Sequence, residues 1–426
     1  MRRHVPIFAA FVMLSPAASS ETLLDAWNAA LDSHLLLDAA REQHEAARLG
    51  LDGARADRHP RLDVASGFTR LDGAPRLAFD GFSSPPLFDN DSFLTASAEV
   101  SVPLYTGGAL RHGVLAAESA ADASEWRIGA VTQEIKLAVA IAYIDVLRAE
   151  SALIVADSNV ATLTAHTADA ENRYESGAVP RNDYLAASVA LAAAGQQRLR
   201  AQNALELARA AFNRLLAREL TASVDLDPEL GVDGLVGDTL DYAGLVSLAR
   251  ERRPELAAAE AAARALREQS DASRGESKPQ LALRGGYWHL ENEVLDEEGF
   301  WTVGIGLQWN LFDSGRSRSR AAVFDRRADA LLLERADLEA GIALEIRRAL
   351  LDRAEAESRR LLAGQAAEQA AENLEVARDR YVSGAGTNAD VLDAEALRTE
   401  SIDNLDNAGF DIDAAELRLA RAVGAL

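Results

Sequence analysis

An internal repeat constrains this chain more than any other feature. RYESGAVPRNDYLAA (173–187) and RYVSGAGTNADVLDA (380–394) are identical at eight of fifteen positions and lie 380 − 173 = 207 residues apart. The same offset aligns VPLYTGG (102–108) with WNLFDSG (309–315). Self-similarity over this distance indicates two copies of one structural unit in a single chain.

The offset is larger in the first part of each copy. HPRLDVASGF (59–68) aligns with KPQLALRGGY (278–287) at 278 − 59 = 219 residues. The first copy therefore contains 219 − 207 = 12 additional residues, which fall in a loop-like stretch rich in Pro, Gly, Ser and Asp (70–92). The predicted organisation is a signal segment (1–20), a first repeat (21–220), a linker (221–243) and a second repeat (244–426).

Each repeat is predicted to fold as helix, strand, loop, strand, helix, turn, helix. Proline is absent between Pro103 and Pro180 and again after Pro279. Because proline breaks a helix interior at a cost of about 3 kcal/mol, these runs rich in Ala, Leu, Glu and Arg can form long helices. The predicted helices are 22–58, 108–174, 181–217 and 315–381. The two longest would each span roughly 100 Å, which predicts an elongated antiparallel bundle in which two half-length helices match one long helix.

The last helix carries a heptad pattern of apolar residues at alternating spacings of three and four. Its members are Leu405, Ala408, Ile412, Ala415, Leu419 and Ala422. This spacing predicts coiled-coil packing, and alanine along the seam allows the helices to approach closely. Judged from the helices alone, the chain could be a structural coiled-coil protein that bridges the periplasm without a pore.

The predicted strands argue against that alternative. LTASAEVSVPLY (94–105) and WTVGIGLQWNL (301–311) alternate apolar residues with small or polar residues over about ten positions. Aromatic residues gather near the strand ends, and those predicted to form a membrane girdle are Tyr105, Trp288, Trp301, Trp309 and Phe312. This combination is typical of an outer-membrane β-barrel. Four strands cannot close a barrel, so several chains must pool their strands, and three chains would supply twelve.

The first twenty residues have the pattern of a cleaved secretory signal. Arg2 and Arg3 precede the apolar run VPIFAAFVML (5–14), and Ala18 and Ser20 fit the small-residue positions before a cleavage site. No other run reaches the ~18 apolar residues of a membrane helix. The formal net charge of −23 becomes −23 − 2 = −25 once the two arginines are removed. So acidic a chain is an unsuitable partner for nucleic acid.

Motifs for catalysis or cofactor binding were not found. The chain has no cysteine, which excludes disulfides and thiolate chemistry. HEAAR (44–48) lacks the second histidine of a zinc-protease motif, no phosphate-binding GxxxxGK[ST] is present, and the histidines show no metal-ligand spacing. We therefore predict no enzyme activity, no cofactor and no metal site.

With these features the chain resembles the TolC-like outer-membrane factor family, also described as outer membrane efflux proteins. The resemblance spans 22–425 and rests on the two-fold repeat, the strand–glycine junctions PLYTGG and NLFDSG, and the helix-turn tips YESGAVPRNDYL and YVSGAGTNADVLDA. It implies an α+β membrane protein and a homotrimer. Four strands per chain would form a trimeric 12-stranded β-barrel, continued by a long antiparallel α-helical barrel, with the linker as an equatorial belt.

The resemblance also implies a function and a location. The trimer would sit in the outer membrane with a periplasmic helical tunnel, as the passive exit duct of a tripartite efflux or type I secretion system. Its partners would be outer-membrane lipid, a periplasmic adaptor protein and an inner-membrane transporter of the RND, ABC or MFS type. The sequence does not separate small-molecule or metal efflux from protein secretion.

The resemblance further assigns roles to residues at the repeated tips. Asp390 and Asp393 match aspartates that form carboxylate rings at the family's gate, although both also suit the solvated start of a helix. Asp183 and Tyr381 match positions in polar links between neighbouring helix pairs, while a packing role suits Tyr381 equally well. The family's basic partner falls at Gly386, which has no side chain.

Small residues at the two tips are predicted to let an adaptor's backbone approach closely. The predicted adaptor-contacting residues are Gly177, Ala178, Val179, Gly384, Ala385, Gly386 and Thr387. The three glycines among them suit turns that need a positive φ angle, and Pro180 suits the first turn of the returning helix.

Overall fold

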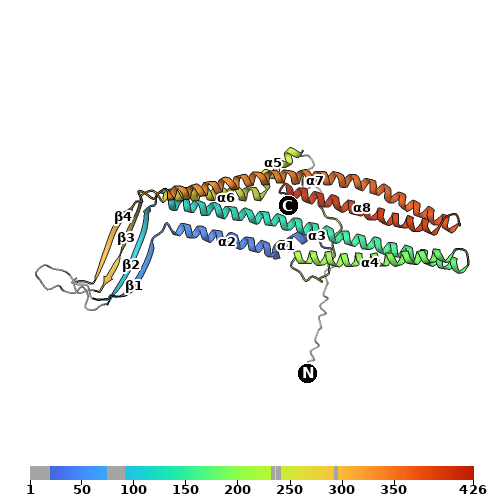
Figure 1. Ribbon diagram of the computed structural model, residues 1–426, viewed down its shortest axis with the longest axis horizontal. Helices are drawn as coiled ribbons and strands as arrows, with labels where there is room; N and C mark the ends of the chain where they lie inside the picture. Colours follow the sequence, from blue (N-terminus) through green and yellow to red (C-terminus); the bar gives the residue numbers. More distant parts are fainter. Residues whose placement is uncertain (1–19, 74–91, 232–235, 237–240, 292–295) are drawn as a thin grey trace, which may run out of the picture.

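The protein is an elongated molecule with a β-sheet at one end and two helical hairpin turns at the other (Figure 1). The computed structural model describes residues 20–73, 92–231, 236, 241–291 and 296–426. The predicted signal segment lies outside this part of the chain except for Ser20, as do most of the predicted 70–92 loop and part of the linker.

The structure confirms the two-fold repeat element by element. The elements are α1 (Leu23–Ser33), α2 (Leu35–Ala56), β1 (Arg61–Arg70), β2 (Ser92–Tyr105), α3 (Ala109–Glu175), α4 (Arg181–Leu215), α5 (Tyr242–Arg252), α6 (Pro254–Gly275), β3 (Gln280–Leu290), β4 (Gly299–Gln308), α7 (Arg316–Val382) and α8 (Asn388–Ala422). Both α3 and α7 have 67 residues, and both α4 and α8 have 35. The offset is 280 − 61 = 219 at the first strands and 299 − 92 = 207 at the second, which places the 12-residue surplus between β1 and β2.

The predicted first helix, 22–58, is wrong in one respect because it breaks at His34. His34 has φ −81° and ψ 115°, which ends α1, and its imidazole accepts a hydrogen bond from the Leu36 amide at the start of α2. In the second repeat the equivalent break is at Arg253, with φ −71° and ψ 112°. Pro254 follows it and disfavours helical backbone at Arg253. His34 and Arg253 are equivalent positions, because they are separated by the repeat offset of 253 − 34 = 219 residues.

The four strands form one antiparallel sheet in the order β1-β2-β3-β4. β1 and β4 are therefore its two edges. Pro103 cannot donate a ladder hydrogen bond, and the pairing of β2 with β3 shifts between Pro103 and Tyr105. Strand β4 runs from Gly299 to Gln308, whereas the predicted strand was 301–311. The observed strand therefore begins and ends two to three residues earlier than predicted.

The strand register gives the sheet one apolar face. Paired residues share a face, and the apolar one carries Leu62, Val64, Phe68, Leu94, Ala98, Val100, Val102, Leu281, Leu283, Tyr287, Trp301, Val303, Ile305 and Leu307. Its members on β4 are largely exposed, at 67% for Ile305 and 85% for Val303. The opposite face carries Glu99, Arg284 and Thr302.

Trp288 does not join the other predicted girdle residues on the apolar face. It pairs with Ser97 on one side and Phe300 on the other, which puts it on the polar face. Trp301 contacts Tyr287 on the apolar face, with ring centroids 5.4 Å apart and the ring planes tilted by 57°. Tyr105 and Trp309 lie at the end of the sheet that joins the helices, and the indole N–H of Trp309 donates to the Ser277 carbonyl at 3.2 Å.

The main hydrophobic core lies halfway along the helices, where the linker crosses the bundle. Tyr143 on α3 is fully buried there, in edge-to-face contact with Phe212 on α4. Its hydroxyl lies 2.6 Å from the carbonyl of Glu21 and 2.7 Å from that of Asp227, so it ties the start of the first repeat and the linker to α3. Arg218 completes the junction with a two-point ion pair to Glu21.

The heptad seam predicted for the last helix is confirmed in α8. Ala408, Ala415, Leu419 and Ala422 are buried there, while Leu405 and Ile412 are partly buried. Among the helices described, none combines the length and the apolar character needed to cross a membrane.

Candidate functional site at the helix tips

The two hairpin turns farthest from the sheet have nearly the same backbone. Gly177 and Gly384 both have φ 76°, in the left-handed region that favours glycine. The amide of Ala178 donates to the carbonyl of Arg173 at 2.8 Å, and that of Ala385 donates to Arg380 at 2.8 Å. This pattern is the Schellman helix end, which satisfies carbonyls at the termini of α3 and α7. The turn residues are largely exposed.

Gly386 differs from the other two turn glycines, and its predicted positive φ is wrong. A Cβ at Gly386 would lie 3.0 Å from Cβ and 3.2 Å from the carbonyl carbon of Arg380, so glycine is needed for a close approach rather than for a left-handed backbone. Val179 occupies the equivalent place in the first turn and packs against the core beside Tyr381 and Val391. The second turn is thus the tighter of the two.

Asp390 is a helix-capping residue. Its amide donates to the Thr387 hydroxyl at 3.2 Å, and the Thr387 amide donates to its carboxylate at 2.8 Å. Hydrogen bonding of the carboxylate to the Thr387 backbone, and then to the Thr387 side chain, lowers the pKa of Asp390. Asp393 lies one turn further along α8, and both carboxylates are exposed while Val391 and Ala394 are buried. The two aspartates therefore face away from the core between α7 and α8.

The resemblance places Tyr381 and Asp183 in polar links between neighbouring helix pairs, and within the described residues these two side chains form no hydrogen bond with each other. Tyr381 is 4% exposed, and its hydroxyl has no hydrogen-bond partner among the described residues. Burial raises the pKa of Tyr381, and the nearby Asp183 charge adds to that effect. The phenol lines a cavity of about 440 Å³ together with His166, Asp169 and Arg378.

A buried polar link joins the two hairpins instead, and sequence reasoning missed it. The His166 imidazole donates from Nε2 to the side-chain oxygen of Asn388 at 2.7 Å, and the Asn388 amide donates to the backbone carbonyl of Asp183 at 3.1 Å. Asn388 is 3% and His166 is 9% exposed. The link connects α3, α8 and α4. His166 and Asn388 are 222 positions apart in the sequence, so no local spacing rule could have detected their contact.

Arg173 places a cation against Tyr381 at the tip. Its guanidinium lies 5.3 Å from the Tyr381 ring centroid and donates to the carbonyl of Val382 at 3.3 Å. Asp169, one turn earlier on α3, accepts from its Nε at 2.8 Å and fixes its orientation. The sequence feature that could have indicated a role for Arg173 is the Arg-Tyr pair that begins both copies of the repeated stretch.

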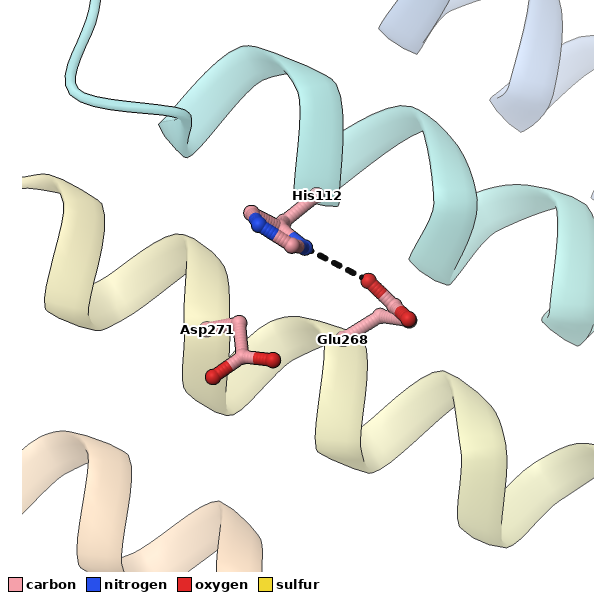
Figure 2. A group of neighbouring side chains, drawn as sticks. All are labelled: His112, Glu268 and Asp271. Atoms are coloured by element: carbon pink, nitrogen blue, oxygen red, sulfur yellow. Dashed lines mark hydrogen bonds and ion pairs between the residues drawn. The ribbon is translucent and has the colours of Figure 1, made fainter.

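At the other end of the helices, the structure brings together residues that no sequence pattern connects. His112 on α3 lies beside Glu268 and Asp271 on α6 (Figure 2). The Nδ1 atom of His112 is 2.7 Å from a carboxylate oxygen of Glu268. The α3–α4 and α7–α8 turns, which carry the predicted tip and gate residues, lie at the opposite end of the bundle (Figure 1).

Comparison with known proteins gives a consistent family. The model of the family described as "Outer membrane efflux protein" matches residues 26–218 and 245–425. The chain is similar to the outer membrane protein TolC of Vibrio cholerae, with 25% identity over 441 residues that cover 100% of this chain and 96% of TolC. It is also similar to the alkaline protease secretion protein AprF of Pseudomonas aeruginosa, with 24% identity over 100% of this chain and 89% of AprF.

Solved structures show the same fold. The structure of CusC, studied for its folding and transmembrane channel formation, superposes with a TM-score of 0.83 at 19% identity. The superposition covers 100% of this chain and 98% of CusC. The helical hairpins, the tips and the four-stranded sheet are therefore arranged as in a protein that forms such a channel.

Proposed function

Because the chain belongs to the outer membrane efflux protein family, we propose that it forms the trimeric exit duct of a tripartite efflux or type I secretion system. It is an outer-membrane protein with a periplasmic helical region, and it is a transport conduit rather than an enzyme. The type I secretion role is supported by AprF, which is named for the secretion of alkaline protease. The efflux role is supported by the description of the family.

The single observation that carries the proposal is the open sheet. Its edge strands β1 and β4 pair with other described strands on one side only. Unpaired backbone groups cost several kcal/mol each in lipid, so the edges must be covered by another chain. β1 and β4 run antiparallel to each other, and β4 of one copy can therefore pair with β1 of the next. Three copies give a closed barrel of twelve strands.

The apolar face of the sheet faces lipid in this arrangement. Val64, Val303 and Ile305 are at least 67% exposed in the single chain and have no other apolar surface to cover them among the described residues. Trp301 lies toward one end of the face, and Tyr105, Trp309 and Phe312 lie toward the other, as expected for aromatic girdles. Glu99, Arg284 and Thr302 then line the water-filled interior.

The helix tips form the gate in this proposal. A trimer brings together three copies of Asp390 and three of Asp393 on exposed surfaces of α8. Carboxylates converging in a narrow aqueous throat focus negative potential, which attracts cations and opposes close packing of the tips. The buried His166–Asn388 link holds the two hairpins of each chain together, so opening moves the hairpin pairs relative to those of neighbouring chains.

The exposed turns are the docking surface for a periplasmic adaptor. Ala178 and Ala385 present small side chains beside the left-handed glycines, so a partner's backbone can approach closely. The adaptor connects the trimer to an inner-membrane transporter, which supplies the energy because the duct itself carries out no chemistry.

Cysteine cross-linking tests the trimer directly, because the natural chain has no cysteine. Ala65 and Gly304 lie near the middle of β1 and β4, on the polar face. The Ala65→Cys, Gly304→Cys double variant, treated with a short bis-maleimide in outer membranes, should give covalent dimers and trimers. The sheet order keeps the two cysteines of one chain on opposite edges, so they cannot react with each other.

Each single-cysteine variant is the matched control and should remain monomeric on a denaturing gel. A double variant that stays monomeric while both cysteines react fully with a monofunctional maleimide would contradict the barrel. Cross-linked products of more than three chains would show that the barrel is a larger ring than a trimer.

A further inference from the structure

A histidine and two carboxylates meet between α3 and α6 (Figure 2), near the end of these helices that adjoins the sheet. His112 is the fourth residue of α3, and Glu268 and Asp271 lie one turn apart on α6. Their ligand atoms all lie within 4.8 Å of one another. The side chains of His112 and Glu268 are 32% and 30% exposed, so the group is partly shielded yet open to ions.

The backbone holds the two helices in place around this group. Gly275 ends α6 directly against the start of α3, where a Cβ on Gly275 would lie 2.7 Å from the Ala109 amide nitrogen. Gly107 faces the Gly275 carbonyl with similarly little space and has φ 66°. This glycine contact fixes the separation of α3 and α6 within two turns of His112. The three side chains are thus carried on a rigid frame.

The packing of the helices does not by itself require these residue types. The repeat offsets map His112 to 112 + 207 = 319, which is Ser319, and map Glu268 to 268 − 219 = 49, which is Leu49. Asp271 maps to Asp52, which forms a 3.5 Å ion pair with Arg55, as Asp271 does with Arg274 at 2.6 Å. Both α2 and α6 therefore keep the acid–arginine pair, but only on α6 do a second carboxylate and an imidazole, from His112 of α3, lie beside the aspartate.

We propose that His112, Glu268 and Asp271 bind a divalent transition-metal ion of the Zn²⁺ class. One imidazole nitrogen and two carboxylate oxygens suit Zn²⁺, and water completes a four-coordinate shell. Ligands about 2.0–2.1 Å from Zn²⁺ lie about 3.3 Å apart, so small side-chain rotations convert the observed group into a metal site.

Metal binding replaces the hydrogen bond between His112 and Glu268. The Nδ1 proton passes to solvent water and the ring takes a proton at Nε2, so the imidazole stays neutral and offers its Nδ1 lone pair to the metal. Arg274 bonds to Oδ1 of Asp271 and also to Asp325 on α7, so it anchors the third ligand, and Oδ2 of Asp271 accepts no hydrogen bond from the described residues. The bound ion clamps α3 to α6 at the junction of sheet and helices, a role independent of the gate at the tips.

The test is competitive Zn²⁺ titration of the full-length, detergent-purified protein after removal of metal with EDTA. A chromophoric chelator reports free Zn²⁺, and thermal unfolding is measured with and without the ion. We expect one saturable site per chain and a higher unfolding temperature with Zn²⁺. His112→Ala and Asp271→Asn should each weaken binding at least tenfold and abolish the temperature shift.

Two control variants separate the site from general surface carboxylates. Asp52→Asn removes the repeat-equivalent aspartate, and His44→Ala removes a helix histidine that is bonded to the Ser124 hydroxyl. Both should bind Zn²⁺ like the natural protein. Equal affinity in all variants, or no saturable binding, would overturn the proposal. If His112→Ala fails to assemble, the affinity of Asp271→Asn for Zn²⁺ tests the proposal. The visible absorption of bound Co²⁺ is then the second readout.

Discussion

Thr387 and Asp390 cap the start of α8 reciprocally, each accepting a hydrogen bond from the backbone amide of the other. The aspartate that the family resemblance assigns to a gate is therefore also a helix-capping residue. Its repeat equivalent, Asp183, has no such partner, because Pro180 occupies the N-cap of α4. Experiments on Asp390 must separate the loss of its charge from the loss of its cap.

Replacing Asp390 by alanine should loosen the first turn of α8, whereas Asp390→Asn should preserve most of it. An asparagine oxygen still accepts from the Thr387 amide, while alanine leaves that donor without a partner. Amide hydrogen exchange in the first turn of α8 measures the effect. Asp183→Ala is the control and should leave exchange at the start of α4 nearly unchanged.

The same cap should depend on pH in a defined direction. The hydrogen bonds from Thr387 lower the folded-state pKa of Asp390, so the folded state binds this proton less readily than the unfolded state. The cap contributes fully above the ordinary aspartate pKa and is lost as pH falls through the lower folded value. Exchange in the first turn should accelerate over that acid range in the natural protein, relative to Asp390→Ala measured at the same pH.

Asn388→Ala should destabilise the tip by about 1–3 kcal/mol. It leaves the Nε2 group of His166 and the carbonyl of Asp183 without partners in a buried site. Asn373 is an exposed asparagine on α7 and the repeat equivalent of His166, so Asn373→Ala is a matched control. Equal thermal unfolding temperatures for the two variants would show that the link does not hold the hairpins together.

Replacing glycine by alanine should change the free energy of unfolding in opposite directions at the tip and inside a helix. Gly384→Ala should destabilise by about 1–2 kcal/mol, because φ of 76° is strained for alanine. Gly341 lies inside α7 with open space around its Cα, so Gly341→Ala should stabilise by about 1 kcal/mol through higher helix propensity. Thermal unfolding of the two variants checks the prediction, and shifts of the same sign would contradict it.

Tyr143→Phe should loosen the linker and change the response to alkaline pH. Burial raises the folded-state pKa of Tyr143 from 10.0 to about 12. The stability that the neutral phenol contributes is complete below pH 10 and is lost as pH rises toward 12, because the unfolded chain ionises first. The natural protein should lose stability over this range more steeply than Tyr143→Phe. Tyr242→Phe, at a 41% exposed tyrosine, should behave like the natural protein.

Local patterns in the sequence predicted most of the fold. Proline placement located α3, α4 and α7 to within two residues, and period-two alternation located β2 and β4. The break at Arg253 was readable from Pro254, and the repeat then implies the break at His34, which has no proline after it. The break at His34 was missed because the helix-forming pattern continues across it.

Tertiary contacts could not be predicted in the same way. His166 and Asn388 are 222 positions apart, and His112 and Glu268 are 156 apart, so their proximity depends on how α3 packs against α8 and α6. The face on which Trp288 lies was also invisible in the sequence, because it depends on the register of β3 with β2 and β4. The sequence suggested that Gly386 is needed for a positive φ angle. It is needed because Arg380 leaves little space for a Cβ atom.

Single-channel conductance in a planar bilayer tests the central claim most directly. The natural protein, shown to be folded and trimeric, is compared with the Asp390→Asn, Asp393→Asn double variant, which removes both charges and keeps the cap acceptor. The account predicts a small cation-selective conductance whose size or selectivity changes in the variant. A conductance identical in the two proteins would remove the gate from the tips, and the absence of any conductance would contradict the channel itself.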